Sequence, residues 1–242
     1  MRLVVAIGYW CRFVTDISIA KNNTTKNPYS TYRIWIFYYF CKAKPRNMRY
    51  KILDQNGLNY LTLTIVEWID LFTRPVYHQI IIDSLKYCQM HKQLKVHAFV
   101  IMPSHLHLIL STPSETGLSS ILRSFKSFTA KQILKYLKDK QQPESRREWL
   151  LNHFAFNARK SKTHSEYKIW QRDNHPIILY SPKVIRQKLN YIHLNPVAAQ
   201  IVREPQEYIF SSASNYVLGT GVLDVELLDV FGPDIGYVHL GM

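Results

Sequence analysis

The spacing of hydrophobic residues predicts most of the secondary structure between residues 59 and 140. Residues 59–69, NYLTLTIVEWI, are rich in Thr, Ile and Val and predict a strand. Residues 75–92 begin with proline and have apolar side chains at helical spacing, which predicts a helix, and residues 94–102 predict a second strand. Residues 118–140 predict another helix. Its inner side is expected to hold Ile121, Leu122, Phe125, Phe128, Ile133, Leu134 and Leu137.

The stretch IMPSHLHLIL, residues 101–110, places two histidines in a run that otherwise suits a buried strand. The turn at Pro103 and Ser104 is so short that the strands on either side of it must be antiparallel. A period of two puts His105 and His107 on one face of the strand. The other face holds Leu106, Leu108 and Leu110. The leucine face is therefore expected to pack in the core, and the other face presents two imidazoles side by side.

The order of these elements is strand, helix, strand, turn, strand, helix. It predicts an α+β fold, a ferredoxin-like antiparallel sheet with covering helices. Residues 141–169 are mixed and rich in Lys and Arg, which predicts a loop with a short helix. Residues 181–197 predict a helix that begins with a serine cap and a proline and ends at a second proline.

Two polar residues of this last predicted helix are candidates for chemistry. Tyr191 and Asn195 are spaced i and i+4, so both side chains project from the same face. Asn195 precedes Pro196, which biases it away from helical backbone and is expected to free its side chain at the helix end. Judged from this helix alone, Tyr191 also suits a place in an amphipathic core.

Charge is unevenly distributed along the 242 residues, which carry a net charge of +14. Residues 1–47 carry +7, residues 48–203 carry +13 and residues 204–242 carry −6. A basic body with an acidic tail favours a polyanionic partner, most simply nucleic acid, although charge alone does not distinguish this from a solubilising surface. We therefore expect a poorly structured and possibly non-native leader at 1–47, a catalytic domain at 48–203 and an acidic extension at 204–242.

The cysteines and the apolar runs of the sequence indicate the cellular compartment in which the protein works. Cys11, Cys41 and Cys88 have no paired or metal-like spacing, which fits a reducing cytoplasm. The longest apolar run, IWIFYYFC at residues 34–41, is too short to cross a bilayer. We expect a cytoplasmic protein without a membrane partner.

Taken alone, a His-x-His pair on a strand is a weak signal that also fits structural histidines or a regulatory metal site. Four segments taken together are more specific. HAFVIMPSHLHLIL, LRSFKSFTAK, IWQRDNHPI and QKLNYIHLNPVAAQIVREPQEYIFSSASNY resemble, in that order and spacing, the IS200-like single-tyrosine (Y1, HUH) transposases, most closely the REP-associated tyrosine transposases. The resemblance runs from about residue 60 to residue 229.

This resemblance implies that His105 and His107 bind a divalent metal, that Tyr191 is the nucleophile and that Asn195 completes the metal site. It implies metal-dependent cleavage and transfer of single-stranded DNA through a covalent 5′-phosphotyrosine, in the mobilisation of hairpin-bearing repeats. Two imidazoles and an amide suit Mn²⁺ better than Mg²⁺, but either metal would serve.

Weaker expectations concern the DNA-binding residues. Lys188 lies one turn before Tyr191 and is a candidate phosphate contact. Arg172 and His175 fall in the WQ segment that resembles the family, where Trp170 is expected to be packed in the core. The predicted helix at 118–140 is expected to present a basic face to a DNA backbone. That face comprises Arg123, Lys126 and Lys131.

Two other functions stay open at this point. One alternative to a strand-transferring enzyme is a catalytically silent or host-domesticated nucleic-acid-binding relative. The other is a metal endonuclease that uses water. The sequence also leaves open whether the site is built within one chain or by exchange of the tyrosine helix between the two chains of a homodimer.

Overall fold

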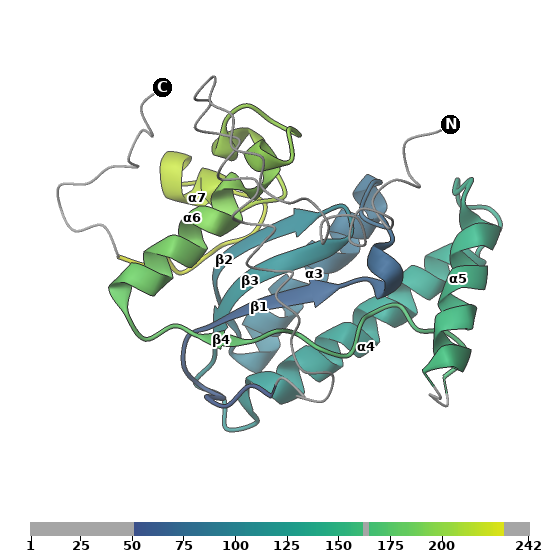
Figure 1. The fold of residues 1–242 in the computed structure, drawn as a ribbon, viewed down its shortest axis with the longest axis horizontal. Coiled ribbons are helices and arrows are strands. Elements are labelled where there is room, and N and C mark those ends of the chain that lie inside the picture. The colour runs from purple at the N-terminus through teal and green to yellow at the C-terminus, as the bar shows by residue number, and fades with distance from the viewer. Residues whose placement is uncertain (1–50, 162–164, 230–242) are drawn as a thin grey trace, which may run out of the picture. The chain divides into compact units, whose positions relative to one another are not determined.

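The computed structural model describes residues 51–161 and 165–229, which belong to a compact unit that spans Arg49–Met242. The expected leader at residues 1–47 lies outside the described residues. In chain order the elements are β1 (Asn59–Thr64), η1 (Val66–Trp68), α3 (Pro75–Lys92), β2 (Lys95–Met102), β3 (His105–Ser111), α4 (Gly117–Lys138), α5 (Arg147–Lys160), β4 (Ile177–Ile178), α6 (Pro182–Ala198), η2 (Pro205–Glu207) and α7 (Ala213–Leu218) (Figure 1).

The strands form one antiparallel sheet in the order β2-β3-β1-β4. The α3 helix connects β1 to β2, and the turn at Pro103 and Ser104 connects β2 to β3, so β3 returns between the first two strands. This is the strand order of a ferredoxin-like sheet, and the predicted fold class is confirmed. The two-residue strand β4 was not predicted, because its pairing with β1 is too short to leave a sequence pattern.

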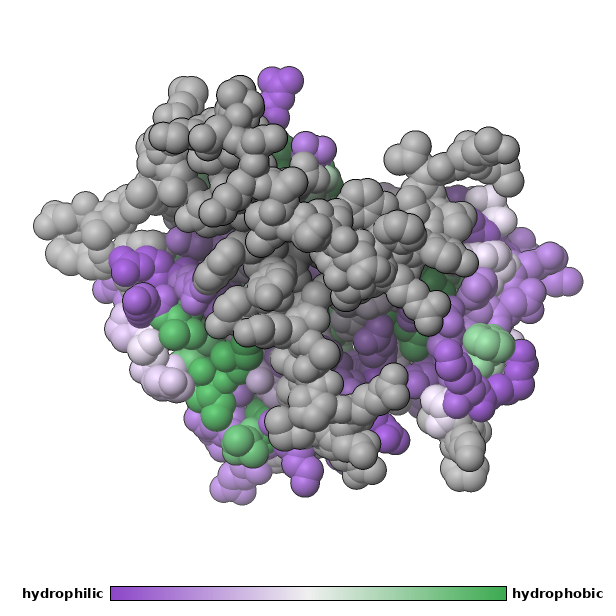
Figure 2. Space-filling model, in the orientation of Figure 1, coloured by the Kyte–Doolittle hydropathy of each residue, from purple (hydrophilic) through white to green (hydrophobic). Residues whose placement is uncertain are grey.

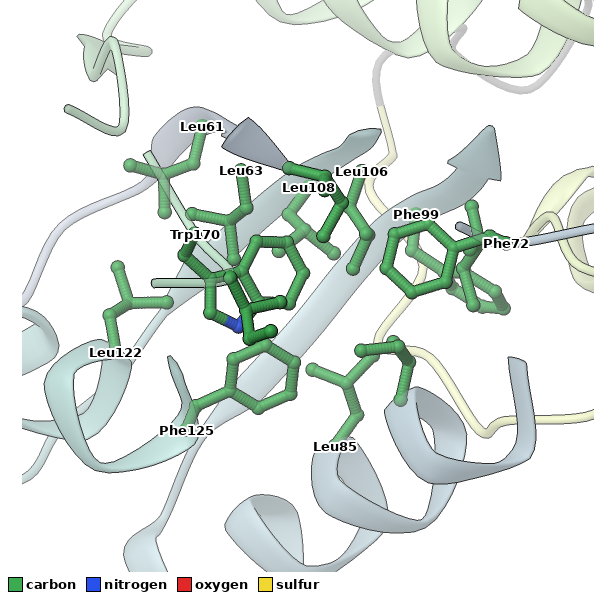
Figure 3. Close-up of a cluster of buried hydrophobic side chains, with 14 of the residues drawn as sticks. Leu61, Leu63, Phe72, Leu85, Phe99, Leu106, Leu108, Leu122, Phe125 and Trp170 are labelled. Atoms are coloured by element: carbon green, nitrogen blue, oxygen red, sulfur yellow. The ribbon is translucent and has the colours of Figure 1, made fainter. Parts of the chain in front are cut away.

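Helices cover both faces of the sheet, so alternate residues of each central strand enter two different cores. Figure 3 shows one core, in which Leu61 and Leu63 of β1 and Leu106 and Leu108 of β3 face Leu85 of α3 and Leu122 and Phe125 of α4. Trp170 is buried in this core, as expected, and its indole Nε1 donates a hydrogen bond to Thr129 Oγ1 at 3.0 Å. The other core packs Leu189 and Ile192 of α6 against the opposite face of the sheet.

Local signals determine where two helices begin. The α3 helix begins at Pro75, whose missing N–H costs nothing at a first helical position, and it is followed by Gln93 in left-handed backbone. The α6 helix has the predicted cap, because the Ser181 side chain accepts a hydrogen bond from the Val184 N–H. It also has Pro182 in its first turn. The observed bounds of α3 match the predicted ones, and α6 ends one residue beyond the prediction.

Two predictions about local structure were wrong, and in a third segment the predicted helix is longer than expected. The first strand ends at Thr64 instead of residue 69, because the chain turns at η1, where Glu67 and Trp68 both have positive φ. Phe128 is 52% exposed, because α4 meets the sheet with a narrower apolar stripe than the pattern suggested. The segment 141–169 contains a full helix, α5, that uses the buried side chains of Leu150 and Phe154.

The described part of the segment expected as an acidic extension packs against β2. Ser211 forms an antiparallel bridge with Val100, and the Glu226 N–H donates to the Val96 carbonyl at 2.9 Å. The Tyr216 hydroxyl donates to the His97 carbonyl, also at 2.9 Å. These bonds cover what would otherwise be an open sheet edge.

The surface is mixed in polarity. Figure 2 shows hydrophilic residues around α5 and a group of hydrophobic residues near β4. In the part of the chain that the structure describes, no helix combines the length and apolar character needed to span a bilayer.

Candidate active site

The β3 strand carries both histidines to the middle of the sheet, on the face that α6 covers. His107 lies opposite Thr62 of β1 and Val100 of β2. It is 2% exposed, whereas His105, at the end of the hairpin, is half-buried. The centroids of the two imidazole rings are 4.7 Å apart. The predicted pair of adjacent imidazoles is therefore present in the fold.

Both imidazoles are neutral at physiological pH. Burial lowers the pKa of His105 to about 4. Burial also lowers the pKa of His107 well below its ordinary value, and repulsion from a protonated His105 and from the Lys188 ammonium lowers it further. A neutral imidazole has a nitrogen lone pair available, so this pair is in the protonation state that metal binding requires.

Two residues of β1 orient His107. The Tyr60 hydroxyl lies 2.8 Å from His107 Nδ1, and Thr62 Oγ1 lies 3.0 Å from the same nitrogen. When Nδ1 carries the proton it donates to these oxygens, and the lone pair of Nε2 then points toward α6. The Tyr60 ring also stacks on the imidazole, with 5.6 Å between centroids. Tyr60 and Thr62 thus hold the histidine in one position.

The α6 helix places Tyr191 beside this histidine. The Tyr191 hydroxyl lies 3.4 Å from His107 Nε2, which is long for a hydrogen bond, and the two rings meet edge to face. Burial raises the pKa of Tyr191, and a hydrogen bond with the Asn195 side chain lowers it in part. Histidine, tyrosine and asparagine converge within one chain, so this arrangement needs no exchange of α6 between two chains.

Lys188 adds a positive charge to the cluster. Its ammonium lies 4.7 Å from the centroid of the Tyr60 ring and 5.8 Å from that of Tyr191. The contact with Tyr191 follows from the helix, because Lys188 precedes Tyr191 by three residues and shares its face. The contact with Tyr60 of β1 follows from the packing of α6 on the sheet. A phosphate beside the Tyr191 hydroxyl would lie close to this ammonium.

The predicted release of Asn195 from the helix was wrong. The α6 helix continues through Pro196 to Ala198, and the Asn195 carbonyl accepts a helical hydrogen bond from the Ala199 N–H. Pro196 is buried, so its packing outweighs the unfavourable backbone preference of the residue before it. Asn195 reaches Tyr191 because the two residues are four apart on a continuous helix.

Comparison with protein families gives one match, to the family described as "Transposase IS200 like", over residues 47–168. These residues make up half of the chain and include β1, the histidine strand and α4. The chain belongs to the IS200-like transposase family. It is therefore an enzyme with transposase activity, as the sequence resemblance predicted. The matched residues end before α6, so the family match does not include Tyr191. The position of this tyrosine beside His107 comes from the fold alone.

Two solved structures are similar to this IS200-like transposase. One is a REP-associated tyrosine transposase bound to a REP hairpin, with 18% identity and a TM-score of 0.49, covering 77% of this chain and 96% of that one. The other is a Deinococcus radiodurans R1 crystal structure described as a transposase, with 14% identity and a TM-score of 0.35, covering 60% of this chain and 92% of that one. Among curated proteins, none matches the chain in sequence.

The loop before β4 carries two of the expected DNA-binding residues. Arg172 is exposed, and His175 is half-buried with a φ of 45°. The loop runs beside β1, where the Gln171 N–H donates to the Thr64 carbonyl at 2.8 Å. The Thr62 N–H likewise donates to the Asn174 carbonyl at 2.8 Å. The transposase therefore holds Arg172 and His175 along the strand that carries Tyr60 and Thr62.

Lys126 does not belong to an exposed basic face, which corrects the prediction for this residue. Its ammonium donates to the Gln171 carbonyl at 2.6 Å and to Asn174 Oδ1 at 2.8 Å. Burial lowers its pKa to about 8. Arg123 and Lys131 of the same helix are exposed, but α4 covers the face of the sheet opposite α6. Lys126 anchors the loop that carries Arg172 instead of facing solvent.

Sequence reasoning missed the roles of Tyr60 and Thr62. Their signal was present in NYLTLT, where alternate residues place Tyr and Thr on the face opposite the core leucines. The partner of that face was not predictable, because it depends on the register between β1 and β3, which aligns Thr62 with His107.

Proposed function

We propose that this transposase cleaves single-stranded DNA with the Tyr191 hydroxyl as its nucleophile and forms a covalent 5′-phosphotyrosine. The observation that carries the proposal is the 3.4 Å approach of Tyr191 to His107, from elements 84 residues apart in sequence. A half-buried tyrosine that contacts a neutral imidazole, with a second imidazole and a lysine close by, is unusual for a packing role, because several polar groups gather in one place.

The residues present fit a divalent metal. His105 and His107 offer two neutral imidazoles, and the Asn195 amide has an oxygen to offer while its N–H donates to Tyr191. Among the described residues no group of three or more His, Cys, Asp and Glu forms a metal cluster, so an amide is a suitable third donor. Bound here, Mn²⁺ or Mg²⁺ would make the phosphorus more electrophilic and stabilise the charge of the transition state.

The side chains of the site have distinct tasks in the cleavage step. The Tyr191 oxygen bonds to phosphorus, the bond from phosphorus to the 3′ oxygen breaks, and the phenol proton is released while the 3′ oxygen gains one. Because burial raises the pKa of Tyr191, the phenolate needs stabilisation from nearby positive charge and from the Asn195 N–H. Lys188 supplies such a charge. The phosphotyrosine keeps the energy of the broken bond, so a second hydroxyl can rejoin the strand.

We propose hairpin-bearing single-stranded DNA as the substrate, on the basis of the sequence resemblance and of the basic body of the chain. The proposed DNA contacts nearest the site are Arg172, His175 and Lys188. Two further proposed contacts, Arg123 and Lys131, lie on α4, which covers the opposite face of the sheet. The exposed basic side chains around the fold would replace counterions on the phosphates.

Binding of such a hairpin should weaken steeply with salt. If the chain neutralises about five phosphates of a single strand, affinity should fall about 100-fold between 50 and 200 mM salt. Fluorescence anisotropy of a labelled hairpin, with chelator present to prevent cleavage, measures this slope. An affinity that does not change with salt would mean that the basic residues only solubilise the surface.

The experiment that tests the proposal is detection of the covalent adduct. The full chain is incubated with a hairpin that carries a 3′-labelled single-stranded flank, and the products are separated on a denaturing gel. We expect a labelled band that migrates with the protein and disappears after protease treatment. Cleavage without an adduct would indicate a water-using endonuclease. Binding without cleavage would indicate a catalytically silent relative.

A further inference from the structure

An exposed tryptophan lies directly beside the histidine pair. The Trp68 ring is 58% exposed, although one edge of it contacts His105 with 5.2 Å between ring centroids. Exposing a large apolar ring costs free energy that burial would have saved, so an exposed tryptophan at the border of a site favours a ligand with a flat apolar surface.

The backbone that presents Trp68 is strained. Glu67 and Trp68 have φ values of 54° and 57°, and neither residue is glycine. Left-handed backbone is unfavourable for such residues, and two in succession persist only where the surroundings stabilise them. One stabilising contact is visible, since the Glu67 carboxylate lies 3.2 Å from His153 Nδ1 on α5. The turn is therefore attached to α5 in the conformation that exposes the indole.

The α5 helix continues the same surface away from the histidines. Trp149, His153, Phe156 and Lys160 follow one another at spacings of four, three and four residues, so they form one stripe along the helix. Trp149 is 46% exposed and Phe156 is 50% exposed. The Lys160 ammonium lies 6.0 Å from the centroid of the Phe156 ring, so the stripe ends in a positive charge. Figure 1 shows α5 beyond the end of β1, where the η1 turn lies.

We infer that Trp68, Trp149 and Phe156, here called the aromatic track, bind the bases of the single strand that enters the active site. The inference rests on the proposed function for the identity of the reaction. Bases stack on exposed aromatic rings regardless of sequence, and neighbouring basic side chains contact the phosphates between them. Arg159 and Lys160, both exposed at the end of α5, suit that second role. A folded protein partner would need a larger continuous apolar area than separate rings along one helix provide.

Binding of an oligothymidine strand to the full chain, measured by fluorescence anisotropy with chelator present, tests the aromatic track. We expect Trp68→Ala to weaken binding about tenfold and Trp68→Phe to retain most of the affinity, because a smaller ring still stacks. Phe156→Ala should weaken binding severalfold. Tyr87→Ala is the matched control, since Tyr87 is 53% exposed on α3, a helix that carries none of the proposed DNA contacts, and it should leave binding unchanged.

A strand of abasic sites separates stacking from indirect effects on folding. On that strand, wild type and Trp68→Ala should bind equally, because no base is left to stack. Unchanged oligothymidine binding by Trp68→Ala, or the same loss on the abasic strand, would overturn the inference. A change of oligomeric state in Trp68→Ala or Phe156→Ala, without a change in DNA binding, would also overturn it. That result would indicate that these rings dock a second chain.

Failure of the inference is distinguishable from failure of the proposed function. Adduct formation in a chain whose strand binding is insensitive to Trp68 would overturn the aromatic track alone. A strand affinity that depends on Trp68, in a chain that forms no adduct, would overturn the tyrosine mechanism alone.

Discussion

Replacing Tyr191 with Phe should lower strand cleavage by about a thousandfold or more, because the substitution removes the oxygen that we propose attacks phosphorus. Binding of the hairpin should be nearly unchanged. The ring remains in place between His107 and Tyr60, and the lost contact with His107 Nε2 is long at 3.4 Å. Single-turnover cleavage of a labelled hairpin, together with anisotropy for binding, measures both quantities.

Tyr60→Phe is the matched control for this variant, since it removes a hydroxyl from the same cluster. That hydroxyl contacts His107 Nδ1, so its loss should slow cleavage by disturbing the orientation of the imidazole, yet the covalent adduct should still form. Cleavage that persists in Tyr191→Phe at the rate of the unaltered protein would transfer the reaction to water or to another nucleophile.

Removal of the metal should abolish cleavage, and His105→Ala should do the same. Saturating Mn²⁺, at about 100 times its Kd, should stabilise the folded chain by about 2.7 kcal/mol. This corresponds to a rise in Tm of roughly 5–10 °C for a domain of this size. The rise should be absent in His105→Ala. Thermal melting with and without Mn²⁺ measures metal binding independently of catalysis.

The pH dependence of this shift has a defined direction. An ordinary histidine has a pKa of about 6.5 and would lose metal affinity at pH 6 through protonation. Burial lowers the pKa of His105 to about 4, so its lone pair stays available and the Mn²⁺ shift should be almost as large at pH 6 as at pH 7.5. His91→Ala, an exposed histidine on α3, should behave as the unaltered chain does. An equal Mn²⁺ shift in His105→Ala would exclude this histidine as a ligand.

The sequence by itself determined the elements whose signals are local. Pro75 predicted the start of α3, and the cap at Ser181 predicted that of α6, because a proline or a capped serine acts on its own turn of helix. The hairpin at Pro103 and the period of two placed both histidines on one face, since alternation is a property of the strand alone. The spacing of Tyr191 and Asn195 likewise needed only the helical repeat.

The tertiary structure decided which of these pieces meet. The register of β1 against β3 placed Tyr60 and Thr62 on His107, and the packing of α6 on the histidine face brought the candidate site together within one chain. Packing also turned Lys126 toward a loop 45 residues away and kept Asn195 helical before a buried proline. Contacts between segments far apart in sequence have no local signal, because their free energy comes from surfaces that the chain brings together only on folding.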